Sequence, residues 1–129
     1  MPVTGSPDQL VRILKDTIVA LVRRDGPDLT ARQLSMFLTV YLDKSPHTVR
    51  GLAAFLDVSK PAITRGIDRL EELNLARRKV NPKDRRSVLI QHTVRGAALL
   101  RETRTIVGEA AASEQSAEVS IAPQHASGS

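Results

Sequence analysis

Two helix-forming segments separated by only three residues restrict the fold of this chain most strongly. Apolar side chains recur at helical spacing before and after the tripeptide Asp57-Val58-Ser59. Thr48 is placed to cap the first helix, and Ser59 is placed to cap the second, where Pro61 is tolerated in the first turn. A short helix, a tight turn and a second helix predict a helix-turn-helix, whose second helix enters the major groove of DNA.

The segments around this unit predict further helices and one hairpin. We expect an amphipathic helix over residues 7–24 and a second from Thr30 to Leu42, opened by a capping box of Thr30 and Gln33. We call the second helix of the helix-turn-helix the reader helix. Asn74 is expected to end it, because asparagine accepts the left-handed conformation. Two β-prone segments follow, Ala76–Val80 and Ser87–Gln91, with a charged tip over residues 81–86 between them. The last helix is expected over residues 93–112.

These elements predict a mostly α fold with a small β-hairpin wing, a winged helix-turn-helix. We expect an N-terminal dimerisation helix within residues 1–28 and a DNA-binding domain over residues 29–92. A C-terminal dimerisation helix over residues 93–112 completes the folded part. Residues 113–129 are small and polar, and we expect them to form a disordered tail, since they offer little apolar surface to bury.

The positive charge of the chain is confined to the reader helix and the hairpin. The whole chain carries a formal charge of +5, and residues 58–95 hold ten basic and four acidic side chains. A local basic surface on a near-neutral body favours a polyanionic partner. A solvated surface with no partner is the alternative, so the positions of the charges must decide.

The exposed face of the predicted reader helix carries side chains that suit DNA. Lys60, Thr64 and Arg65 crowd its N-terminal half, where arginine and lysine can donate to guanine and threonine can use its hydroxyl or methyl group. The candidate reader residues are Ser59, Lys60, Pro61, Thr64, Arg65 and Arg69. Thr48 and Arg50 are candidate phosphate contacts. The acidic pair Glu71-Glu72 at the end of the helix is expected to be solvated.

The hairpin tip strengthens the DNA interpretation. Arginine side chains suit a narrow minor groove, whose negative potential is enhanced. Asp84 would repel phosphate, so we expect it to pair with an arginine and hold it in position. The candidate wing residues are Arg77, Lys83, Asp84, Arg85, Arg86 and Ser87.

The stretch Leu29–Leu100 resembles the MarR family of winged-helix regulators, named for multiple antibiotic resistance. The resemblance rests on Leu52-Ala53, residues 57–65, residues 67–71, Leu75-Ala76-Arg77-Arg78, Asp84-Arg85-Arg86-Ser87, Thr93, Gly96 and Leu99-Leu100. It implies a homodimeric repressor that binds a pseudo-palindromic double-stranded DNA operator. The reader helix would lie in the major groove, and Arg86 of the wing would lie in the minor groove. It also implies a small anionic or phenolic effector. Asn74 stands where the family usually has glycine, and a polar tail replaces the closing helix of many members.

Other functions find less support in the sequence. His47, His92 and His125 lack the spacing of a metal or acid–base site, so we expect neither an enzyme nor a cofactor or metal. No cysteine is present, which suits a cytoplasmic location, and no stretch is apolar enough to span a membrane. RNA is disfavoured because Phe37, Tyr41 and Phe55 fall at or near core positions. The remaining alternative is a winged-helix module that binds protein instead of DNA.

Overall fold

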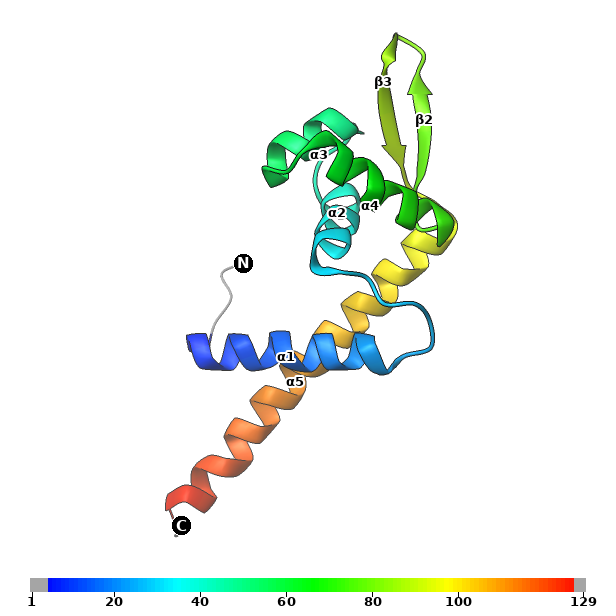
Figure 1. Ribbon diagram of the computed structural model, residues 1–129. Helices are drawn as coiled ribbons and strands as arrows, with labels where there is room; N and C mark the ends of the chain where they lie inside the picture. Colours follow the sequence, from blue (N-terminus) through cyan, green and yellow to red (C-terminus); the bar gives the residue numbers. More distant parts are fainter. Residues whose placement is uncertain (1–4, 127–129) are drawn as a thin grey trace. The chain divides into compact units, whose positions relative to one another are not determined.

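The computed structural model describes residues 5–126, with side chains as far as residue 116. Its elements, in chain order, are α1 (Pro7–Arg23), α2 (Ala31–Leu42), β1 (His47–Thr48), α3 (Val49–Leu56), α4 (Lys60–Glu72), β2 (Arg77–Asn81), β3 (Asp84–Gln91) and α5 (Val94–Ala126) (Figure 1). The predicted fold class, mostly α with a β-hairpin wing, is confirmed. The chain forms two compact units: unit 1 holds residues 1–28 and 102–129, and unit 2 holds Leu29–Arg101.

Unit 2 encloses the apolar core of the helix-turn-helix. The side chains of Phe37, Ile63, Ile67 and Leu70 are fully buried, and Leu52 is 2% exposed. Buried Ile63, Ile67 and Leu70 follow helical spacing on α4, so the opposite face of that helix is left for solvent.

One predicted core position of unit 2 is wrong. Phe55 is 66% exposed, because it lies on the solvent side of α3 near the end of that helix. On α2, Met36, Phe37 and Val40 are buried, whereas Leu42 at its end is 56% exposed.

Local signals fix the helix ends as the sequence predicted. Thr30 and Gln33 form both hydrogen bonds of the capping box, and the Ser59 hydroxyl accepts from the Ala62 amide at 3.3 Å. Asp57 adopts a left-handed conformation (φ 56°) that turns the chain from α3 towards α4. Asn74 is also left-handed (φ 58°) and closes α4, as expected for a residue type that tolerates that region.

The wing belongs to a three-stranded antiparallel sheet, in the order β1-β3-β2. The strands of the hairpin extend further than predicted, to Asn81 and from Asp84, so the loop is shorter than residues 81–86. Strand β1 was not predicted. It pairs His47 with Ile90 and Thr48 with Leu89, which attaches the start of α3 to the wing.

A polar node joins α2 to the end of α4 and the start of α5 within unit 2. The Tyr41 hydroxyl donates to the Leu75 carbonyl at 2.7 Å and accepts from the Thr93 amide at 2.9 Å. The ring of His92 stacks on Tyr41, with centroids 4.0 Å apart. Gly96 is required beside this node, because an added Cβ would overlap the Tyr41 hydroxyl and the Leu75 carbonyl oxygen.

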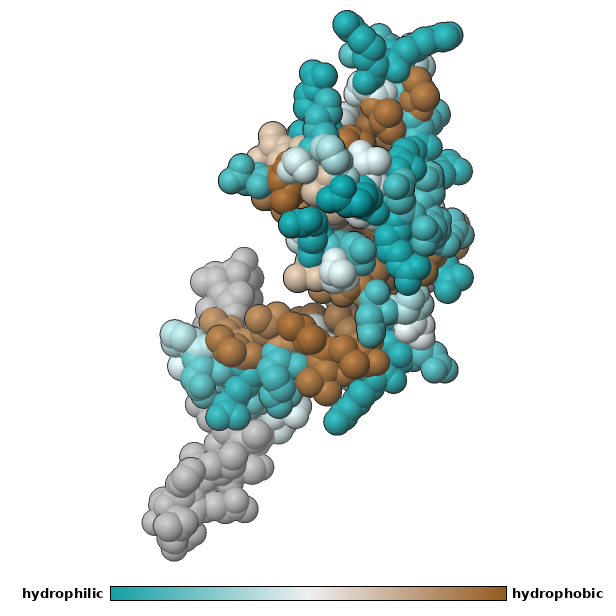
Figure 2. All heavy atoms as spheres, viewed as in Figure 1, coloured by the Kyte–Doolittle hydropathy of each residue, from teal (hydrophilic) through white to brown (hydrophobic). Residues whose placement is uncertain are grey.

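Helix α1 of unit 1 leaves four of its large apolar side chains exposed. On α1 only Thr17 is buried, whereas Val11, Leu14, Ile18 and Val22 are 46–61% exposed. Figure 2 shows apolar side chains gathered along one side of α1. The predicted apolar face is therefore present on this helix, but it is only partly buried.

Helix α5 is longer than predicted. It continues to Ala126, so the predicted disordered tail is corrected for residues 113–126, while residues 127–129 lie outside the described part. Residues 109–122 contain several alanines and glutamates and neither glycine nor proline, and such a composition extends a helix without apolar burial. In the described residues, no helix combines the length and apolar character needed to cross a bilayer.

Candidate nucleic-acid interface

The N-terminal half of α4 presents the predicted reader residues to solvent. Lys60, Pro61, Thr64 and Arg65 are exposed, while the neighbouring Ala62 and Ile63 are buried on the opposite face. The Ser59 side chain is occupied as the N-cap of this helix. The candidate reader side chains therefore face outwards along one side of α4. The buried side chains on the opposite face pack in the core and fix the orientation of the helix.

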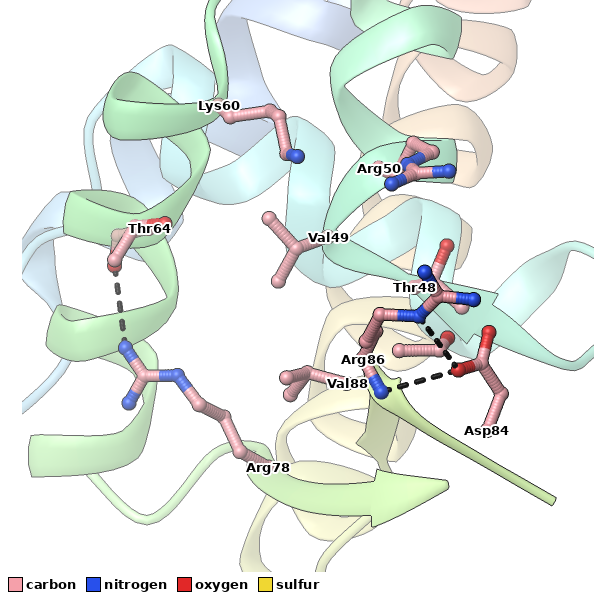
Figure 3. Close-up of a pocket in the computed structure, with 10 residues that line it drawn as sticks. Thr48, Val49, Arg50, Lys60, Thr64, Arg78, Asp84, Arg86 and Val88 are labelled. Carbon is pink, nitrogen blue, oxygen red and sulfur yellow. Dashed lines mark hydrogen bonds and ion pairs between the residues drawn. The ribbon is translucent and has the colours of Figure 1, made fainter. Parts of the chain in front are cut away.

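A groove of about 510 Å³ separates α4 from the wing (Figure 3). The predicted residues among those lining it are Thr48, Arg50, Lys60, Thr64, Asp84, Arg86 and Ser87. Four cations line it: Arg50 from α3, Lys60 from α4, Arg78 from β2 and Arg86 from β3. A concave surface with one dominant sign of charge raises the local concentration of an oppositely charged partner.

The Thr48 hydroxyl caps α3 and can still donate a hydrogen bond. Its Oγ accepts from the Gly51 amide at 2.9 Å, which caps α3. A hydroxyl that accepts in this way can still donate one hydrogen bond outwards. Capping and contact with an anion are therefore compatible at this residue.

At the wing tip, Asp84 engages Arg86 as predicted. Its Oδ1 accepts from the Arg86 amide at 3.1 Å and lies 3.7 Å from the Arg86 Nε. The Arg86 side chain is 94% exposed, so this contact leaves the guanidinium accessible. Lys83 and Arg85 are exposed at the same end, and the Lys83 amide binds the Asn81 side chain at 3.0 Å.

The acidic end of α4 has a role that the sequence did not predict. Glu71 is not simply solvated: it accepts from the Arg78 guanidinium at 2.6 Å and from the Arg78 backbone amide at 3.0 Å. Asp68 also forms an ion pair with Arg78. Glu72 contacts Arg69 at 3.2 Å on the helix surface, so the prediction of a solvated position suits Glu72 alone.

Comparison with known proteins agrees with this geometry. Residues 28–87 match the model of the MarR family, and this range covers α2 to the beginning of β3. A cysteine-to-serine mutant of MarR from E. coli is 26% identical to the chain, with a TM-score of 0.61, and the match covers 88% of this chain and 84% of that one. The chain belongs to the MarR family.

Two further solved structures to which the chain is similar contain a bound partner. The E. coli MarR mutant in complex with operator DNA is 28% identical, covers 83% of this chain and 72% of its own, and gives a TM-score of 0.63. CouR from Rhodococcus jostii, bound to p-coumaroyl-CoA, is 30% identical, covers 76% of this chain and 66% of its own, and gives 0.60. Among curated proteins, none matches the chain significantly.

The MarR family is one of winged-helix transcriptional regulators, and the position of each candidate residue can be stated on that basis. The groove brings together residues of β1, α3, α4, β2 and β3. Five of the candidate residues lie outside its lining: Arg65, Arg69, Arg77, Lys83 and Arg85. Of these five, Arg69 is partly buried beside Glu72 and the others are exposed. Contact of any of them with DNA stays a prediction.

Proposed function

We propose that this MarR-family chain is a homodimeric repressor that binds a pseudo-palindromic double-stranded operator. Helix α4 reads the major groove, and the wing enters the adjacent minor groove. The observation that carries the proposal is the basic groove between α4 and the wing, which lies beside the exposed reader face. The E. coli relative bound to operator DNA supports the choice of partner.

In this proposal the two sides of the groove have different tasks. Lys60, Thr64 and Arg65 contact base edges, because they stand in the exposed N-terminal half of α4. Thr48 and Arg50 contact the phosphates that run between α4 and the wing, and so fix the register of the protein on the duplex. Arg86 reaches into the minor groove, with Asp84 limiting its rotation.

A homodimer accounts for the uncovered face of α1. Val11, Leu14, Ile18 and Val22 repeat at helical spacing, and four such side chains exposed on one helix are unusual for a surface that stays in water. A second copy would cover them and place two reader helices about 34–36 Å apart on one face of the DNA. Val107 on α5, 40% exposed, is the second apolar contribution that we assign to this interface.

The decisive experiment selects DNA from a random pool and maps the bound site by footprinting. We expect two half-sites with a separation of about one helical turn. With about 6–10 phosphate contacts per dimer, the affinity should fall by roughly 10³–10⁵ between 50 and 200 mM salt. A partner bound with little salt dependence would point to the protein-binding alternative.

Arg65→Ala tests the assignment of the reader face. If Arg65 contacts a guanine edge with two hydrogen bonds, affinity for the selected site should fall by about 1–3 kcal/mol, with a much smaller change on random DNA. Arg32→Ala is the matched control, because it removes the same charge from the exposed start of α2. Equal losses on both DNAs would reassign Arg65 to a phosphate.

The effector stays a prediction of the family resemblance. CouR was solved with p-coumaroyl-CoA, which is the ligand of that protein. A small anionic or phenolic compound that releases this chain from its selected site would establish an effector here, and a screen of such compounds by fluorescence anisotropy would find it.

A further inference from the structure

Arg78 lies on β2 of the wing and contacts the reader helix with both its backbone and its side chain. Its Nη1 donates to Glu71 Oε1 at 2.6 Å, and its backbone amide donates to Glu71 Oε2 at 3.0 Å. Its Nη2 donates to Asp68. The same nitrogen donates to the Thr64 carbonyl oxygen at 3.5 Å (Figure 3). One residue of the wing is therefore bound to three residues of α4.

These contacts form a network instead of a single surface ion pair. An isolated exposed pair contributes little to stability, but the planar guanidinium supplies several donors in a fixed geometry. The Arg78 side chain is 30% exposed, less than the two carboxylates that it binds. Hydrogen bonding to Asp68, together with the charges of Asp68 and Glu71, raises the pKa of Arg78 above its usual value.

The spacing of the acceptors gives the network a direction. Residues 64, 68 and 71 repeat at i, i+4 and i+7, which places them along one face of α4 over two turns. Thr64 is itself one of the exposed reader residues. Its backbone carbonyl is the acceptor nearest the N-terminus of α4 in this row. Any shift of β2 along α4 would break several of these bonds at once.

We propose that Arg78 is a positioning residue, which sets the wing at a fixed place on the reader helix and does not itself bind DNA. The inference rests on the proposed function, since a wing held in this way matters only if α4 and the wing read one duplex together. The guanidinium acts through Asp68 and Glu71. Its effect is to fix the distance from the reader residues to Arg86.

The competing explanation is that Arg78 is a phosphate ligand, because it lines the same groove as Lys60 and Arg86. The two explanations predict opposite changes in DNA affinity when Asp68 and Glu71 are removed. Removing Asp68 and Glu71 makes the interface more positive and frees Arg78, so a phosphate ligand would then bind DNA more tightly. A positioning residue would lose its anchors, and binding would weaken.

The test is therefore the double variant Asp68→Ala with Glu71→Ala. We expect its affinity for the selected site to fall roughly tenfold, although the protein gains two units of positive charge. Alanine favours helix, so α4 is expected to persist. Glu72→Ala is the matched control: it removes an acid from the same helix without touching the wing, and we expect equal or tighter binding. Tighter binding by the double variant would overturn the proposal.

A second measurement separates positioning from a general loss of fold. In an Arg78→Ala background, Arg86→Ala should cost less than half the factor that it costs in the wild type, because the wing is then already displaced. Arg78→Lys should rescue only part of the loss, since lysine cannot bridge two carboxylates and a carbonyl. Additive effects, or a fall of about 0.9 per protomer in the salt slope with Arg78→Ala, would make Arg78 a phosphate ligand.

The free protein provides a readout that does not depend on DNA. The Arg78 amide is held by Glu71, so Glu71→Ala should speed its hydrogen exchange at least tenfold, while the paired amides of β3 keep their protection. Unchanged exchange would overturn the clamp itself. Wild-type protein that selects no DNA sequence would instead overturn the proposed function, so the two failures are distinguishable.

Discussion

The helix-turn-helix core of unit 2 and helix α1 of unit 1 differ in how far their apolar side chains are covered. Unit 2 buries Phe37, Ile67 and Leu70 completely, whereas α1 of unit 1 leaves Leu14, Ile18 and Val22 46–60% exposed. The apolar side chains of unit 2 named here are covered by residues of the same unit, whereas those of α1 are not. The difference teaches where the proposed homodimer should act: unit 2 is expected to fold from its own residues, while α1 is expected to gain stability from a second copy.

The strongest test of this comparison places charge on the uncovered helix. Leu14→Asp with Ile18→Asp should raise the dimer dissociation constant at least ~100-fold, since burial of each side chain contributes about 1.5–3 kcal/mol. Sedimentation at micromolar concentration measures the change. Lys15→Asp is the control, because it alters the charge of the same helix equally and should leave the dimer intact. A wild type that sediments as a 14.1 kDa monomer, free and on DNA, would end the dimer model.

The second test concerns the filled core of unit 2. Phe37→Ala should lower the free energy of unfolding by about 3–5 kcal/mol, because it empties a site with no exposure. Phe55→Ala makes the same chemical change at a side chain that is 66% exposed, and we expect a change within about 0.5 kcal/mol. Denaturant unfolding at two protein concentrations checks both. Similar losses at the two sites would contradict the burial described for unit 2.

A smaller pair of changes compares the units through the same local motif. Ser6 opens α1 and Thr30 opens α2, each with both bonds of a capping box. Replacement by alanine should cost about 1 kcal/mol in either case. For Thr30→Ala the loss should not depend on protein concentration, but for Ser6→Ala it should appear mainly as weaker dimerisation. Identical concentration dependence of the two variants would remove the distinction between the units.

The smallest expected effect lies at the wing tip, where Lys83, Asp84, Arg85 and Arg86 are exposed charged side chains. Asp84→Ala should weaken binding to the selected DNA by about 0.5 kcal/mol, although it removes a negative charge, because Arg86 loses an exposed partner. Asp28→Ala, at an exposed acid outside the groove, should not weaken binding. Fluorescence anisotropy would measure both. Tighter binding by Asp84→Ala would show that Asp84 only repels the DNA phosphates and does not position Arg86.

Local sequence signals were sufficient for the helix-turn-helix and for much of the wing. The caps at Thr30 and Ser59 and the helix end at Asn74 each depend on the chemistry of one or two residues, so they could be predicted without tertiary information. The exposed reader face followed from the helical period, because the buried residues of α4 define the opposite side.

What could not be predicted depends on contacts between distant segments. Strand β1 has only two residues, too few to show a period, and it exists because β3 pairs with it from about forty residues away. The acids Asp68 and Glu71 gave a pattern typical of a solvated helix end until the wing placed Arg78 against them. The exposure of Phe55 likewise depends on how α3 is rotated in the unit, which its own sequence does not determine.

The hydrogen bond from the Arg78 amide to Glu71 also affects how molecules of this protein meet in concentrated solution. Strand β2 is the outer strand of the sheet on the wing side, and unpaired amides on such a strand invite strands of other molecules to add. Here one of those amides is already bound to a carboxylate, and the charged side chains of Arg77 and Lys79 flank it. These features disfavour aggregation by strand addition at the wing. A variant without Glu71 would leave the Arg78 amide unpaired on the edge strand, and we expect it to aggregate more readily.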